Sequence, residues 1–185
     1  MTKPSSWAAA IAAAIAALAL AGSAAAREEP TTFDGSCSMD GVLSFGDELG
    51  LLPEPSTWAL DVAGTCTGTL DGAPVAGTPA TIGIAGAGEL GCLASLSPGG
   101  SPGTLSFTRD PRRRSDDATI DFIFGTFANA TITSLPWRGT GAVSGELVGH
   151  SIFPAEQKLL EDCGAGTLGA TPVHVTVRTA GPFSG

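Results

Sequence analysis

The chain has 185 residues, of which 26 are glycine and 13 are proline, while only 15% are charged. So much glycine and proline disfavours a helical bundle, and the 43% hydrophobic content disfavours disorder, so we expect one domain with a substantial core. The formal net charge of −9 repels a phosphate backbone on average, which argues against nucleic acid as a partner.

The first 26 residues have the three parts of an export signal. Lys3 precedes an apolar run from Trp7 to Gly22, and small residues close the segment before Arg27. The run is too short and too rich in alanine for a bilayer span. We therefore expect residues 1–26 to be a cleaved signal peptide, the mature protein to be secreted, and no membrane span to remain after cleavage.

All four cysteines follow the predicted cleavage site, and an even number of cysteines in an exported chain indicates disulfides first. No pair has the C-x-x-C spacing of a zinc site or a redox motif, so no metal ligand is expected. Three pairings are possible. We favour Cys37 with Cys66 and Cys92 with Cys163, because the first two cysteines lie on early strands that can be neighbours.

Alternation with a period of two dominates the chain after the signal. From Trp58 to Leu70 every second residue is apolar, Gly or Cys, so Trp58 is expected to face inward, and threonines fall on the other face. Residues 82–92 repeat this pattern. Shorter strands are expected at 42–45, 105–107, 120–124, 131–135, 143–147 and 173–177.

Short turn signals separate the expected strands, at 71–74, 97–103 and 137–141, and such short returns join antiparallel strands. One helix is expected from Pro154 to Asp162, ending near Cys163, because a proline start, a run of helix formers and a glycine stop coincide there.

The expected fold is all-β: an antiparallel β-sandwich with one short helix before the last strand. A small up-and-down β-barrel is the alternative, since the strands are long and follow one another as hairpins. We expect a flexible lead at 27–36, a single β-domain over 37–185 and a frayed tail at 180–185.

Two short motifs match known fingerprints but lack their context. Residues 86–91 read G-x-G-x-x-G, yet the chain reaches a Pro- and Gly-rich stretch at 98–103 instead of a helix, so no nucleotide cofactor is expected. Residues 99–103 read G-x-S-x-G, but Pro102 has no N–H to give to an oxyanion hole, which disfavours Ser101 as a nucleophile.

Acid–base chemistry has few candidates. Glu146 and His150 share one face of a strand, and His174 faces outward on another, but such residues are more often solvated positions on the outside of a sheet. Asp61 and Asp121 also face outward, and nothing in the sequence fixes the distance between them. We therefore expect no catalytic residues.

Trp137 and Arg138 are the candidate binding residues, because an exposed indole beside an arginine in a turn can stack on a sugar ring or anchor a protein. The alternative is an indole folded back over the end of the core. The segment 109–117 carries four arginines, but interleaved aspartates offset them, as in a solvated hairpin tip.

The phrase 64–70, the central Cys92 in Leu-Gly-Cys-Leu, the strand 103–107 and the late Cys163 together resemble uncharacterised small secreted proteins of high-GC Gram-positive bacteria. The resemblance implies a secreted all-β fold and no catalytic residues.

Three functions follow as hypotheses. The first is a non-enzymatic binding module, with a cell-surface component or an extracellular protein as its partner. The second is a small barrel that carries an apolar ligand between inward faces lined by glycine. The third is a secreted hydrolase that uses Glu146 or His150.

Overall fold

The structure is a computed structural model. It describes residues 29–92, 95–97, 99–108, 117–125, 127–129 and 134–185. The predicted signal peptide and nearly all of the basic segment 109–117 lie outside the described residues.

Strands make up most of the described chain. They are β1 (Thr32–Leu49), β2 (Glu54–Leu70), β3 (Ala73–Leu90), β4 (Ser95–Ser97), β5 (Ser101–Phe107), β6 (Ala118–Phe124), β7 (Phe127–Asn129), β8 (Ser134–Gly141), β9 (Glu146–Ile152), β10 (Leu168–Thr179) and β11 (Phe183–Ser184). Helix α2 (Glu156–Ala165) precedes β10. The described residues contain no helix that is long and apolar enough to cross a membrane.

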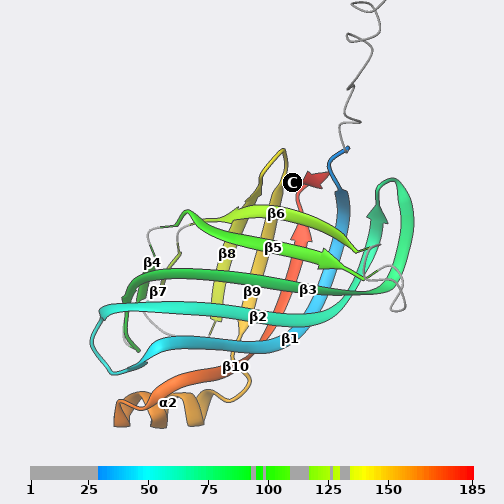
Figure 1. Cartoon of the computed structure of the whole chain (residues 1–185). Helices are drawn as coiled ribbons and strands as arrows, with labels where there is room; N and C mark the ends of the chain where they lie inside the picture. The colour runs from blue at the N-terminus through cyan, green and yellow to red at the C-terminus, as the bar shows by residue number, and fades with distance from the viewer. Residues whose placement is uncertain (1–28, 93–94, 98, 109–116, 126, 130–133) are drawn as a thin grey trace, which may run out of the picture.

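All the strands belong to one antiparallel sheet. Hydrogen-bonded neighbours run β1, β2, β3, β5, β6, β8, β9 and β10, and β10 pairs in turn with β1, so the sheet closes on itself. The sheet folds into two layers, with β2, β3, β5 and β6 crossing over β8, β9 and β10 at a steep angle (Figure 1). The predicted all-β antiparallel fold, with one short helix before the last long strand, is confirmed, and its two layers are parts of one continuous sheet.

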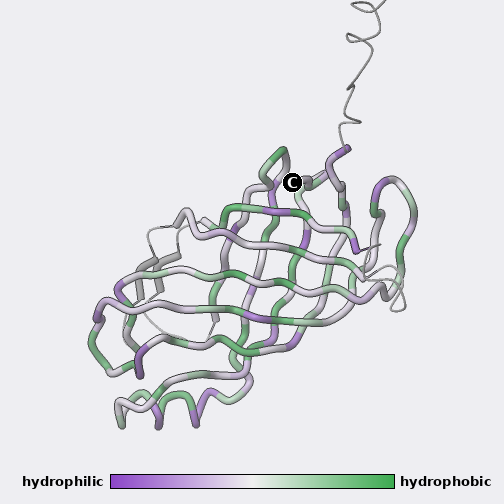
Figure 2. The backbone as a smooth tube through the Cα atoms, viewed as in Figure 1, coloured by the Kyte–Doolittle hydropathy of each residue, from purple (hydrophilic) through white to green (hydrophobic). Residues whose placement is uncertain are grey.

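The space between the layers is filled by aromatic side chains. Ring centroids lie 4.9 Å apart for Phe33 and Phe107, and 5.2 Å apart for Trp58 and Phe124. Phe124 also lies 5.5 Å from Trp137. Apolar and polar residues alternate along the strands, as the tube in Figure 2 shows, because successive side chains point to opposite faces. The alternation of Trp58 to Leu70 therefore buries Trp58 as predicted.

Inward glycines lie beneath these rings. A Cβ at Gly149 would collide with the Trp137 indole, and a Cβ at Gly103 or Gly139 would collide with the Phe122 ring. Aromatic rings that cover strand glycines replace the packing that the glycines themselves lack. At these three glycines the room is therefore occupied by side chains of the protein.

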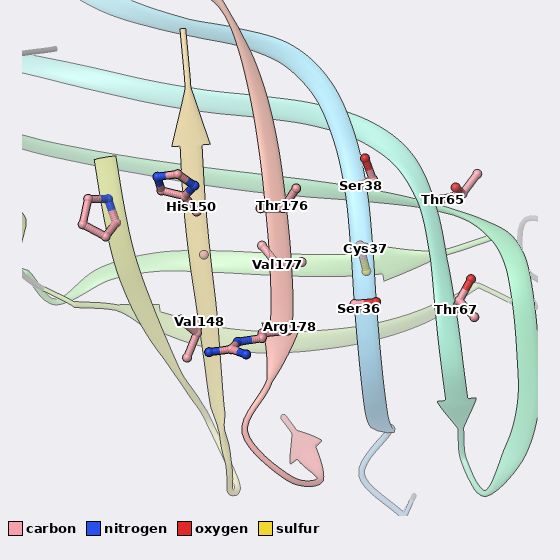
Figure 3. Close-up of a pocket in the computed structure, with 12 residues that line it drawn as sticks. Ser36, Cys37, Ser38, Thr65, Thr67, Val148, His150, Thr176, Val177 and Arg178 are labelled. Atoms are coloured by element: carbon pink, nitrogen blue, oxygen red, sulfur yellow. The ribbon is translucent and has the colours of Figure 1, made fainter. Parts of the chain in front are cut away.

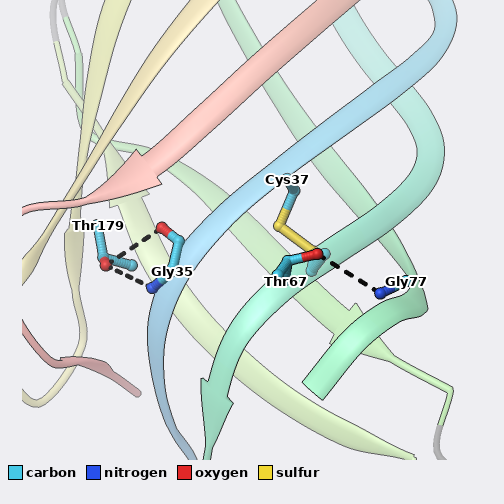
Figure 4. Close-up of a disulfide and its surroundings, with 6 residues drawn as sticks. Gly35, Cys37, Thr67, Gly77 and Thr179 are labelled. Atoms are coloured by element: carbon cyan, nitrogen blue, oxygen red, sulfur yellow. Dashed lines mark hydrogen bonds between the residues drawn. A yellow bond between two sulfur atoms is a disulfide. The ribbon is translucent and has the colours of Figure 1, made fainter. Parts of the chain in front are cut away.

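The first disulfide lies where β2 bends. Cys37 and Cys66 are directly paired on β1 and β2, with Cα atoms 4.0 Å apart, and the register of β2 against β3 shifts between Cys66 and Thr67 (Figure 4). Gly68 follows with φ of 151°, and a side chain there would meet the backbone of β1. The glycine permits the curvature that carries β2 from one layer toward the other (Figure 1).

The second disulfide joins the helix to the sheet. Cys92 follows β3 and Cys163 lies in α2, with Cα atoms 5.8 Å apart. Leu159 and Cys163 are the buried residues of α2, and Gly166 ends the helix in the left-handed conformation. Both favoured disulfide pairings are confirmed, and the helix lies within two residues of its predicted start.

Both predicted loose ends are wrong in part. The lead expected at 27–36 enters β1 at Thr32, and Phe33 is fully buried. The tail expected to fray contains β11, in which Phe183 is fully buried and pairs with Phe33. The two ends hold each other, because β11 pairs with the start of β1 (Figure 1).

The hairpin of β8 and β9 is displaced from its predicted place. The turn expected at 137–141 is part of β8, and the strand expected at 143–147 contains the turn, with β9 beginning at Glu146. Gly145 carries a φ of 83°, which suits a turn, whereas Gly139 and Gly141 lie in the strand. Of the strand expected at 131–135, residues 131–133 lie outside the described residues.

Candidate binding groove

A shallow groove of about 610 Å³ runs over the outer face of five adjacent strands, β2, β1, β10, β9 and β8. We call it the outer-face groove. Figure 3 shows its lining side chains projecting from these strands. Its polar lining consists of Ser36, Ser38, Thr65, Thr67, Thr176, His150 and Arg178.

The strand register gathers these side chains into two rows. Residues directly opposite each other on one face of paired strands lie close together. The first row crosses the sheet from Thr67 through Ser36 to Arg178 and Val148. The second row crosses from Thr65 through Ser38 and Thr176 to His150. The threonine-rich outer face predicted for β2 thus becomes one wall of the groove.

Arg178 is the cation that the groove offers to a ligand. Three Lys or Arg side chains fall in the described residues, and two of them are paired: Arg138 with Glu146 at 2.7 Å, and Lys158 with Asp162 at 2.7 Å. Arg178 is exposed and has no ion pair or side-chain hydrogen bond within the described chain. Its side chain lines the groove, and its guanidinium extends toward β9 beside Val148 (Figure 3).

The structure separates the two predicted binding residues. Trp137 is only 3% exposed, and its indole N–H donates to the Ser151 hydroxyl at 3.0 Å, so it belongs to the core and has no free face for a ligand. The prediction that the segment 137–141 forms an exposed turn is wrong, and the alternative of a buried indole is right. Arg138 is exposed, and the hydrogen bond to Glu146 raises the pKa of its guanidinium.

Glu146 and His150 lie on one face of β9 but do not meet. Glu146 accepts from Arg138, while the His150 Nε2 lies 2.6 Å from the Ser134 hydroxyl. Neither of the predicted hydrolase residues therefore has the other as an acid–base partner. Within the described chain, no three His, Cys, Asp or Glu side chains gather into a metal site.

The remaining sequence candidates take structural positions. Ser101, in the G-x-S-x-G match, opens β5 and is buried, and residues 86–90 of the G-x-G-x-x-G match lie within β3. Asp61 and Asp121 are both exposed, and Asp121 accepts a hydrogen bond from the Thr104 hydroxyl at 3.0 Å.

One arrangement escaped the sequence reasoning. His174 on β10 lies opposite Asp40 on β1, and its Nδ1 is 2.8 Å from Asp40 Oδ1. Its Nε2 is 3.5 Å from the Ser38 hydroxyl, which is part of the groove wall. These residues are separated by more than 130 positions, so only the register of β1 against β10 brings them together.

Comparison with family models, with curated proteins and with solved structures gave no match to this chain.

Proposed function

We propose that the protein is a secreted, disulfide-stabilised β-domain that works outside the cell as a binding module, with the outer-face groove as its ligand site and a cell-surface polymer as its partner. The observation that carries this proposal is the unpaired Arg178 guanidinium in a groove lined with hydroxyls. The two disulfides are compatible with an oxidising compartment.

The chemistry of the groove favours a hydroxylated and acidic ligand. Serine and threonine hydroxyls both donate and accept, so they match the alternating donors and acceptors of a sugar. A guanidinium prefers a carboxylate or phosphate, to which it can give two parallel hydrogen bonds. An acidic polysaccharide combines both groups along one extended chain, and the open groove leaves room for such a chain to pass across the strands. The net charge of −9 opposes the approach of any polyanion at long range, but at physiological salt charges farther apart than about 8 Å are largely screened, so the local contact with Arg178 decides binding.

Retention on an acidic polysaccharide tests the proposal. Purified protein would be passed over immobilised polygalacturonate and, in parallel, over neutral dextran. We expect retention on polygalacturonate, and a loss of about tenfold in affinity for Arg178→Ala, since a charge-assisted hydrogen bond contributes about 1.5 kcal/mol or more.

Lys158→Ala is the matched control, because it also removes one exposed positive charge but lies on α2, away from the groove. It should bind as the wild type does. If Arg178→Ala bound as tightly as the wild type, the groove would not be the ligand site. If the protein were retained equally on dextran, the ligand would not need to be acidic.

A further inference from the structure

Ser38, His174 and Asp40 have the order of groups that activates a hydroxyl nucleophile. The Asp40 carboxylate holds one ring nitrogen of His174 at 2.8 Å, and the other ring nitrogen faces the Ser38 hydroxyl at 3.5 Å. Such a set is recognised by geometry and roles, not by the order of the residues in the chain. Distances between a nucleophile and its base are often longer before a substrate binds.

The hydrogen-bond partners fix the tautomer of His174. An ionised Asp40 can only accept, so the ring hydrogen lies on Nδ1. In the neutral ring, Nε2 then carries a lone pair that points toward Ser38 and can accept its hydroxyl proton. His174 is thus oriented as a base, and Asp40 is the group that orients it.

The hydrogen-bond donors that stabilise the oxyanion formed from an ester carbonyl must be side chains, because the backbone N–H groups are not available. β1 is paired with β2 on one side and β10 on the other, so the backbone N–H groups around Ser38 belong to the sheet ladder. Thr176 lies directly opposite Ser38, and Arg178 is its diagonal neighbour. Both residues line the groove. The Thr176 hydroxyl is the nearer donor, and the Arg178 guanidinium, which extends beside Val148 (Figure 3), would have to turn toward Ser38 to donate.

A second serine and histidine pair on the same face lacks the third group. Ser134 and His150 are in closer contact, at 2.6 Å, but no carboxylate in the described residues is hydrogen-bonded to His150. The two pairs therefore differ by Asp40, which makes the Ser134 pair an internal control.

We propose that Ser38, His174 and Asp40 form an acyl-transfer site that hydrolyses small, unhindered esters. Ser38 Oγ attacks the ester carbonyl while His174 Nε2 takes the hydroxyl proton. The C–O bond then breaks, and the alcohol leaves with that proton, so that the acyl group stays on Ser38. A water molecule attacks the acyl group, passes a proton to His174, and Ser38 leaves with that proton, so ester and water become acid and alcohol.

The open position of the site sets its substrate class. Ser38 and Asp40 are exposed and His174 is half-buried, so water reaches the site freely. Electrostatic stabilisation is weaker where water is not excluded. We therefore expect slow turnover of activated esters. This activity is separate from the proposed polysaccharide binding, because it depends on Ser38 and His174 and does not require a polymer.

A covalent probe tests the proposal directly. A fluorophosphonate releases fluoride on reaction with an activated serine, and tandem mass spectrometry of the digested protein locates the label. We expect the label on Ser38 and its absence in Ser38→Ala. Labelling should fall at least about 100-fold in His174→Ala, which removes the base, and should fall substantially in Asp40→Asn.

Ser134→Ala is the matched control and should label at Ser38 as the wild type does, since Ser134 does not line the groove and its histidine has no carboxylate partner in the described chain. Hydrolysis of p-nitrophenyl acetate is a second readout, but any surface imidazole hydrolyses this ester slowly, so the serine label decides. An unlabelled wild-type protein, a label on another serine, or equal labelling of His174→Ala would each overturn the proposal. Polygalacturonate retention by Ser38→Ala shows separately whether binding survives.

Discussion

Trp137 and Arg138 are neighbours in the sequence but belong to different regions of the molecule. Trp137 points into the space between the layers and is 3% exposed, whereas the Arg138 side chain is 69% exposed and pairs with Glu146 on the outer face. The same division holds along β10, where Val177 is buried and Arg178 lies in the groove. In these strands the inward face packs the core, and the outward face carries the polar side chains that can contact a ligand.

The division follows from the geometry of a strand. Adjacent side chains point to opposite faces, so one strand can place aromatic side chains in the core and hydroxyls on the surface, and the two sets can vary independently. Cys37 and Cys66 lie on the inward faces of β1 and β2. Substitutions of inward residues should therefore change stability, and substitutions of outward residues should change binding or chemistry while stability stays constant.

The largest effect on stability is expected from the disulfide that ties α2 to the sheet. The double variant Cys92→Ser/Cys163→Ser opens a loop of 71 residues, which costs about 4 kcal/mol in the chain-entropy model. The free energy of unfolding in urea measures this loss. The pair Cys37 and Cys66 spans 29 residues, so its removal should cost slightly less, about 3.5 kcal/mol. A loss below 1 kcal/mol for either pair would contradict the entropic account.

Phe122→Ala comes next, with an expected loss of about 3 to 4 kcal/mol. The Phe122 ring is 2% exposed, covers the backbone at Gly103 and Gly139, and lies 5.9 Å from the Phe183 ring. Its neighbour Ile123 is 48% exposed on the other face of β6, so Ile123→Ala is the matched control and should change stability by less than about 0.5 kcal/mol. Similar losses for the two variants would refute the division between the faces.

The sequence predicted the inner face better than the outer one. The period of two placed Trp58 and Cys66 on the buried side, because the alternation of apolar and polar residues along a half-buried strand is visible in the local sequence. The hairpin at 142–145 was misplaced, because glycines serve both turns and strands that pass beneath aromatic rings, and only the structure shows that Gly139 is of the second kind. A local pattern does not distinguish the two uses.

The outer face depends on register, which a single sequence does not contain. Ser38 and Asp40 share one face of β1, and this much the alternation indicates. That His174 lies opposite Asp40 depends on how β10 aligns with β1, and a shift by one residue would turn His174 to the other face. The groove and the serine arrangement are products of that alignment, so sequence reasoning found His174 but not its partners.

Gly149→Ala is expected to cost about 1 to 3 kcal/mol, because its Cβ would occupy the place of the Trp137 indole. Gly83→Ala on β3 is the control: the nearest atom to its Cβ would be Asp61 Oδ1 at 3.7 Å, an ordinary contact. This control should stay within about 0.5 kcal/mol of the wild type. Thermal unfolding followed by tryptophan fluorescence measures both variants, and an unchanged midpoint for Gly149→Ala would show that the ring can move aside.

The smallest effect on stability is expected from Arg178→Ala, the variant that should change binding most. Arg178 is exposed and unpaired within the described chain, so its removal breaks no interaction of the fold and should alter the free energy of unfolding by less than about 0.5 kcal/mol. Urea unfolding of the same preparation used for polygalacturonate binding makes the comparison direct. If binding and stability fell together, Arg178 would be supporting the sheet, and the separation of tasks between the two faces would fail at the residue on which the proposed function depends.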